Sequence, residues 1–237
     1  MKKSFKIFQI LIVIMIISNL SFSQLITIGT GTIQNSNTVY PAPYGNWYWG
    51  AKHQFLITAS EIYAAGGGPG LINSLAFDVV TVNGVALANF EILIGATSIT
   101  NLTTAFESGL TSVYSSASYT EISGWNTHVF STPFVWDGAS NIVVETCFNN
   151  TSYTNNAVFN QSTTSHSSSH EYHTDASGVC TSPGTGSTYT QRPNIQLNMI
   201  PLNIPINLGV ISWDYPTEFC GLPSSMHLRT KIKNWNI

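Results

Sequence analysis

Two histidines flank an acid and a tyrosine in the segment His170-Glu171-Tyr172-His173. The zinc hydrolase motif places two histidines four residues apart on one face of a helix, with a glutamate between them. Here the separation is three residues, and on a strand His170 and His173 would point to opposite faces. A looser site could combine these two with His166 and Asp175, but we expect a solvated polar strand edge and no metal.

Aromatic residues crowd the segment that runs from Tyr40 to Trp49. Four of them are candidate ligand-binding residues, because flat rings with polar edges stack on sugar faces: Tyr44, Trp47, Tyr48 and Trp49. Asn46 and Gln54 could add hydrogen bonds. The alternative is structural packing, since each ring buries about 150–250 Å² in a core.

Other known catalytic motifs are absent from this sequence or incomplete in it. It has no Gly-x-Ser-x-Gly elbow, and the glycine run at 66–70 lacks the Lys-Ser/Thr of a phosphate loop. Glu91 and Glu145 could share a sheet face, although we expect both to face solvent. We therefore predict no catalytic residues, no enzyme activity and no cofactor, with a structural calcium ion at Asp137 or Asp175 as the one alternative.

The composition is that of an uncharged, core-forming chain. Apolar residues make up 43% of it and charged residues only 8%, against a usual level of about 25%. Without Lys2, Lys3 and Lys6, five Lys/Arg stand against eleven Asp/Glu, which gives a net charge of −6. Nucleic acid is excluded as a partner, because phosphate binding needs clustered cations.

Residues 1–23 predict a cleaved secretory signal. Three lysines precede the run Ile7–Ile17, which is apolar apart from Gln9, and Ser21-Phe22-Ser23 has the small-x-small pattern of a cleavage site. We expect a mature chain that starts near Gln24 and is secreted or held on the outer cell surface. No second long apolar run follows, so no membrane anchor is expected in that chain.

The cysteine residues are consistent with a secreted protein. Cys147 and Cys180 are predicted to form a disulfide that closes a loop of 33 residues, worth about 3–4 kcal/mol by chain entropy. Two buried free thiols are the alternative. Cys220 is left over, and we expect its partner to lie outside this sequence.

Residues 24–200 are predicted to form an all-β, antiparallel, jelly-roll-like sandwich. Apolar residues alternate with polar ones at 75–79, 142–146 and 195–199, which is the pattern of half-buried strands. Asn83-Gly84 predicts a hairpin turn. Short helical turns are expected at 59–65 and 103–108, and mobile loops at 161–169 and 181–190.

A second unit is predicted after residue 200. Prolines at 201 and 205 favour an extended linker over 201–207. The alternation of Leu228, Thr230 and Ile232 predicts a strand within 208–237. Since one or two strands cannot bury a core, we expect these residues to open an incomplete Ig-like β-sandwich.

Several stretches together resemble an N-terminal module of large secreted Bacteroidetes proteins associated with type IX secretion. They are 40–50 (YPAPYGNWYWG), 54–57 (QFLI), 59–62 (ASEI), 73–78 (NSLAFD), 124–128 (GWNTH), 134–138 (FVWDG) and 141–149 (NIVVETCFN). The resemblance covers about Ile28 to Asn198, and the tail at 209–216 and 229–234 is similar to the opening of CARDB-like domains. It implies a non-enzymatic extracellular module with no catalytic residues.

Three functions are compatible with this sequence. The first is a structural or adhesive module whose partners are the other domains of a larger secreted protein. The second is a carbohydrate-binding module that uses the aromatic segment Tyr40–Trp49 to hold surface glycans. The third is an accessory front domain of an exported hydrolase whose catalytic part lies elsewhere.

Overall fold

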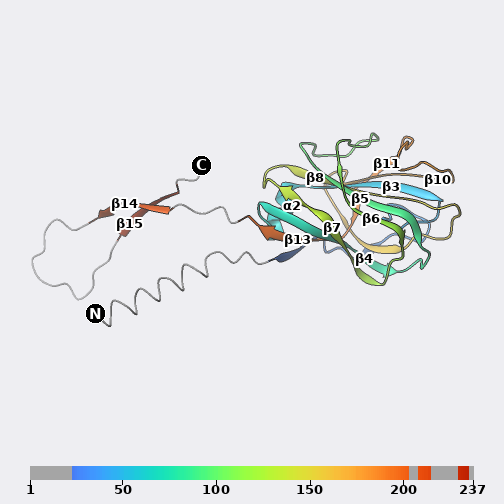
Figure 1. Ribbon diagram of the computed structural model, residues 1–237, viewed down its shortest axis with the longest axis horizontal. Helices are drawn as coiled ribbons and strands as arrows, with labels where there is room; N and C mark the ends of the chain where they lie inside the picture. Colours follow the sequence, from blue (N-terminus) through green and yellow to red (C-terminus); the bar gives the residue numbers. More distant parts are fainter. Residues whose placement is uncertain (1–22, 203–207, 215–228, 235–237) are drawn as a thin grey trace, which may run out of the picture. The chain divides into compact units, whose positions relative to one another are not determined.

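The computed structural model describes residues 23–202 and the strand segments 208–214 and 229–234 (Figure 1). The chain divides into two units, one ending at Leu202 and the other spanning Asn203–Ile237. The predicted signal segment up to residue 22, most of the predicted linker and Cys220 lie outside the described residues. None of the described helices is long and apolar enough to cross a membrane.

The first unit consists of two antiparallel sheets that lie face to face (Figure 1). The seven-stranded sheet contains β1 (Gln24–Ile28), β13 (Ile195–Pro201), β4 (Gly70–Thr81), β9 (Val158–Thr163) and β12 (Gln191–Pro193), with β7 (Gly124–Trp136) beside β4 and β2 (Ile33–Gln34) beside β9. The six-stranded sheet runs in the order β11 (Ser187–Tyr189), β10 (Ser169–Thr174), β3 (Gly50–Ile57), β8 (Asn141–Asn149), β5 (Leu87–Thr97) and β6 (Thr111–Tyr119). The prediction of an all-β sandwich is confirmed.

The core fills the space between these sheets. Ile195, Leu197 and Met199 of β13 all point inward, as their alternation predicts. They meet inward-facing side chains of the opposite sheet, which include Phe55 of β3 and Phe90 of β5. Burial of such apolar surface is the main force that holds the two layers together.

The outer face of the six-stranded sheet is covered as well. Strand β8 alternates in sequence, yet nearly all of its side chains are buried. Val143 and Leu56 point away from the main core and pack against Leu102, which belongs to the connection between β5 and β6. This cover explains why Glu145 of β8 is buried although solvent exposure was expected.

Asn83-Gly84 does not form the predicted hairpin. Strand β4 belongs to the seven-stranded sheet and β5 to the six-stranded one, so this turn carries the chain from one layer to the other. The backbone amides of Asn83 and Gly84 both donate to one carboxylate oxygen of Glu121, at 2.5 and 3.0 Å. Gly84 has a φ of 75°, which suits glycine in the turn.

One of the two predicted helical turns is present. Helix α2 (Ala59–Ala64) begins with a capping box in which the Thr58 side chain accepts from the Glu61 amide and the Glu61 carboxylate accepts from the Thr58 amide. The prediction of a helical turn at 103–108 is wrong, because these residues are irregular and help to cover the outer sheet face.

The predicted loops are shorter than expected. Within 161–169, the first three residues finish β9 and Ser169 opens β10, whose partner β11 lies inside the second predicted loop. The Leu56 amide donates to the Ser168 carbonyl at 2.8 Å, so this segment is tied to β3.

The predicted disulfide is confirmed. Cys147 of β8 is bonded to Cys180, with their Cα atoms 5.6 Å apart. The bond attaches the segment that follows β10 to the outer face of the six-stranded sheet.

In the second unit, β14 (Leu208–Asp214) pairs antiparallel with β15 (Arg229–Asn234). The strand expected from the alternation around Thr230 is therefore present. Assignment of this strand pair to an Ig-like domain stays a prediction.

Candidate functional site

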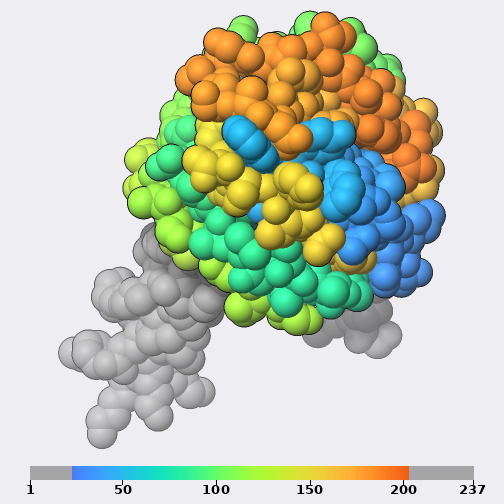
Figure 2. Space-filling model, turned by 90° about the vertical axis from the view of Figure 1, so that its right-hand side faces the viewer, coloured from blue at the N-terminus to red at the C-terminus, as the bar shows by residue number. Residues whose placement is uncertain are grey.

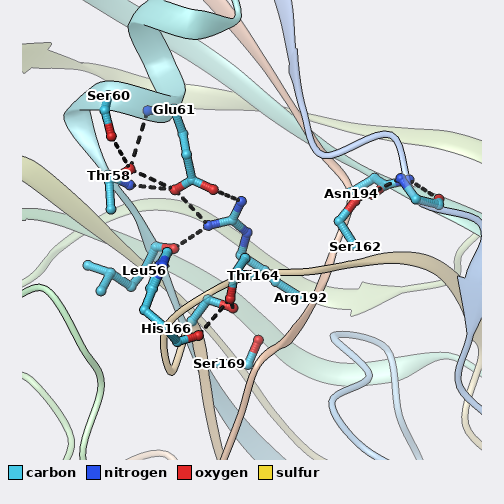
Figure 3. Close-up of polar contacts among 12 residues, drawn as sticks. Leu56, Thr58, Ser60, Glu61, Ser162, Thr164, His166, Ser169, Arg192 and Asn194 are labelled. Atoms are coloured by element: carbon cyan, nitrogen blue, oxygen red, sulfur yellow. Dashed lines mark hydrogen bonds and ion pairs between the residues drawn. The ribbon is translucent and has the colours of Figure 1, made fainter.

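An open pocket of about 440 Å³ lies beside the first turn of α2. Four segments that are far apart in the sequence form its walls, namely 29–30, 58–61, 162–166 and Arg192. Figure 3 shows the contacts around it, with the side chain of Arg192 reaching toward Glu61 and the backbone of Leu56.

An ion pair between the buried Arg192 and the partly exposed Glu61 lines this pocket. The Arg192 side chain is 1% exposed, and its Nη2 and Nη1 lie 2.6 and 3.1 Å from the Glu61 oxygens Oε1 and Oε2. Nη1 also donates to the Leu56 carbonyl. Burial raises the pKa of the Glu61 carboxyl, but Arg192 and Thr58 outweigh this and hold the pKa below its usual value.

Local structure fixes both members of the pair. Arg192 lies on β12 opposite Ser162 of β9, which places it in the seven-stranded sheet. Glu61 is held by the capping box of α2, directly after β3 of the six-stranded sheet. The guanidinium therefore links the two layers through Glu61 and the carbonyl of Leu56 in β3.

Hydroxyl side chains of the segment 162–166 also line the pocket. Ser162 Oγ accepts from the Gly31 amide at 2.7 Å and donates to Asn194 Oδ1 at 2.8 Å. Thr164 Oγ1 donates to the His166 carbonyl at 2.6 Å. These bonds hold the backbone of 162–166 in one conformation.

Two nitrogens among the lining residues lack partners. Arg192 Nε and His166 Nε2 are both buried without a hydrogen bond. Most buried polar groups in native proteins are hydrogen-bonded, and an unsatisfied one costs about 1–3 kcal/mol. Neither nitrogen is exposed, so both are unsatisfied inside the fold and do not face the pocket.

The predicted aromatic residues lie elsewhere, on the face shown in Figure 2, where residues near 40–49 (blue) adjoin those near 150–156 (yellow). Trp47, Tyr48 and Trp49 are half-buried there. Tyr44 is fully buried, and its hydroxyl lies 2.6 Å from His128 Nε2. For Tyr44 the packing alternative holds, since no part of its ring reaches the surface.

The two expected hydrogen-bonding partners of a sugar are also occupied. Asn46 is buried and bonded to Thr154. Gln54 is buried, and its amide nitrogen donates to the Glu145 carboxylate at 2.7 Å and to the Glu107 carbonyl at 2.8 Å.

The two histidines of the segment 170–173 point to opposite sides of β10. The His170 ring packs on Phe106 with centroids 4.0 Å apart. The His173 ring lies between Tyr40 and Tyr48, at 4.5 and 4.1 Å, and its Nδ1 is 2.7 Å from the Glu171 carboxylate. In the described part of the chain, no three His, Cys, Asp or Glu side chains form a group suited to a metal ion.

The aspartates considered for calcium accept hydrogen bonds from backbone amides, Asp137 within its own turn and Asp175 from a distant segment. Asp137 accepts from the amides of Ala139 and Ser140, both at 2.8 Å, and these bonds together with the Ser140 hydroxyl lower the pKa of its carboxyl. Asp175 accepts from the Trp49 amide at 3.2 Å.

Glu91 and Glu145 lie on the same outward face of neighbouring strands, because Glu91 is paired with Cys147. Glu145 is buried and lies 2.9 Å from Lys52 Nζ. Burial raises the pKa of the Glu145 carboxyl even though Lys52 opposes the shift.

Sequence reasoning missed the pair formed by Arg192 and Glu61. The pattern Thr58-x-x-Glu61 before an apolar residue is a capping box and could have indicated the helix start. Nothing local in the sequence indicates that Arg192, more than 100 residues away, completes the site. No family model, curated protein or solved structure matches this chain.

Proposed function

We propose that residues 24–202 form a non-catalytic extracellular module with a structural or adhesive role in a larger secreted protein. The observation that carries this proposal is that buried and partly buried carboxylates are bonded to side chains of the fold itself. Glu61, whose carboxylate bonds Arg192 and Thr58, is the clearest case.

Two further carboxylates are used in the same way. Glu145 contacts Lys52 and Gln54, and Glu171 contacts His173 and the Tyr189 hydroxyl at 3.0 Å. A general acid or base must reach a proton of the substrate. Carboxylates that are hydrogen-bonded to side chains of their own fold are better suited to holding strands and loops in place.

Two other observations support export. Strand β1 begins at Gln24, directly after the predicted cleavage site, so removal of the preceding segment would leave every strand of the sandwich intact. The disulfide between Cys147 and Cys180 is of the kind that persists in oxidising compartments.

Turnover assays on the purified chain test the proposal. The chain is incubated with chromogenic glycosides, esters and peptides, beside a Glu171→Gln variant and a Glu61→Gln variant. We expect no turnover above a buffer blank. Turnover that either variant abolishes while its melting curve still shows a folded protein would overturn the non-catalytic assignment.

A carbohydrate-binding role is the second candidate, because Trp47, Tyr48 and Trp49 keep part of their rings exposed. Binding to insoluble polysaccharides and a glycan array tests it, with Trp47→Ala and Trp49→Ala as variants. Lost binding with an unchanged melting temperature favours this candidate. Unfolding of both variants favours packing.

A further inference from the structure

We propose that the pocket between α2 and the turn at 162–166 binds a small, neutral, hydroxyl-rich ligand, such as the terminal ring of a sugar. This inference goes beyond the structural role proposed above. It also concerns a different surface from the aromatic segment at Tyr40–Trp49.

The dimensions suit a small molecule. Ligand sites generally have volumes of about 300–1,000 Å³, and this pocket has about 440 Å³. Its lining is held in place by the ion pair of Arg192 with Glu61 and by the hydrogen-bonded hydroxyls of Ser162 and Thr164. A site held in place before binding loses less entropy when the ligand enters.

The charges of the pocket favour a neutral ligand. The positive charge of Arg192 and the negative charge of Glu61 lie in direct contact and offset each other. An anion that approached Arg192 would meet the Glu61 carboxylate, and a cation that approached Glu61 would meet the guanidinium. Neither kind of ion could recover the cost of leaving water.

The hydrogen-bonding groups of the lining match hydroxyls. Thr30, Ser60, Thr163 and Ser165 all line the pocket and are exposed. A serine or threonine hydroxyl donates and accepts, as a sugar hydroxyl does, so neighbouring pairs can form in either direction.

A nuclear magnetic resonance titration tests the proposal. The ¹⁵N-labelled chain is titrated with methyl α-mannoside, methyl β-galactoside and N-acetylglucosamine to about 20 mM, which detects millimolar binding. Sodium acetate and phosphate are the anion probes, and choline is the cation probe. We expect saturable amide shifts at Gly29, Thr30 and 163–166 with at least one sugar, and none there with the ions.

Variants of exposed residues that line the pocket make the test specific. Thr163→Ala and Ser165→Ala should each weaken sugar binding about three- to tenfold, the effect of one hydrogen bond. Ser165→Trp should fill the pocket and abolish binding. Ser177→Ala, in an exposed position outside the pocket, is the matched control and should bind normally.

Three results would overturn the proposal. They are sugar-induced shifts confined to Trp47–Trp49, saturable binding of an ion in the pocket, and the absence of saturable shifts with all three sugars. The structural role proposed above does not depend on this outcome, because it is tested by turnover and not by binding.

Discussion

Acidification from pH 7.5 to pH 5 should destabilise the sandwich by about 4 kcal/mol, because two histidines are buried in the neutral form. Burial lowers the pKa of both His53 and His128 to about 3. Their pKa in the unfolded chain is about 6.5. Between these values the unfolded chain binds more protons than the folded one, so the free energy of unfolding falls as the pH falls.

The size of the effect follows from the pKa difference. At pH 5 each histidine is about 1.5 pH units below its unfolded pKa, and each unit is worth about 1.4 kcal/mol, which gives about 2 kcal/mol for each residue. Burial also lowers the pKa of His170, which adds to the loss. Glu145 acts in the opposite direction, since its raised pKa favours the protonated folded state as the pH falls.

The hydrogen bonds explain why these rings stay neutral. His53 Nε2 accepts from the Ala42 amide at 3.2 Å, so the proton is on Nδ1, which is buried without a partner. His128 Nε2 lies 2.6 Å from the Tyr44 hydroxyl, and its Nδ1 is also unpartnered. A second proton on His128 would place a charge in the core, where burial is the cause of its lowered pKa. For His53, the carboxylate of its cross-strand partner Glu171 offsets only part of the cost of burial.

Urea unfolding followed by tryptophan fluorescence at several pH values between 7.5 and 5 measures this loss. A His53→Gln variant should retain the bond from Ala42 and show about half of the pH dependence. Ser177→Ala serves as the control and should follow the wild-type curve. A loss below about 1 kcal/mol in the wild type, or an unchanged slope in the variant, would refute the reasoning.

Two further predictions concern covalent and ionic links. Reduction of Cys147–Cys180 should lower the melting temperature by about 6–12 °C in calorimetry, from a loss of about 3 kcal/mol in a chain of this size; an identical melting curve with both thiols free to alkylation would contradict it. Glu61→Ala should cost about 3 kcal/mol in urea unfolding, because it leaves the Arg192 charge buried and unpaired. The double variant with Arg192→Met should lose less than Glu61→Ala alone, and an equal or larger loss would show that the pair is not the cause.

Local patterns predicted the sandwich well. The alternation at Ile195, Leu197 and Met199 survives in the structure because one face of β13 meets the core. The same reasoning failed for Glu145, since burial of the outer sheet face depends on the distant connection that carries Leu102. The alternation of apolar and polar residues along a strand predicts which side chains share a face of the sheet. It does not predict which other segment covers that face.

Prediction from local sequence also fails where long-range contacts decide the structure. Asn83-Gly84 has the right residues for a hairpin, but the choice of sheet for the next strand is made by long-range pairing. Tyr44 belongs to an aromatic segment by sequence and to the core by structure. The partnership of Arg192 with Glu61 joins two distant segments, and no local spacing encodes it.

The guanidinium of Arg192 also has a mechanical consequence. Two apolar layers can slide past one another with a gradual loss of contact. The Arg192 guanidinium, in contrast, is hydrogen-bonded to the Leu56 carbonyl and to Glu61, so these bonds must break before the two layers separate at this position. Under tension along the strands, this position should resist until it gives way abruptly. Such an abrupt failure would suit the adhesive role proposed above.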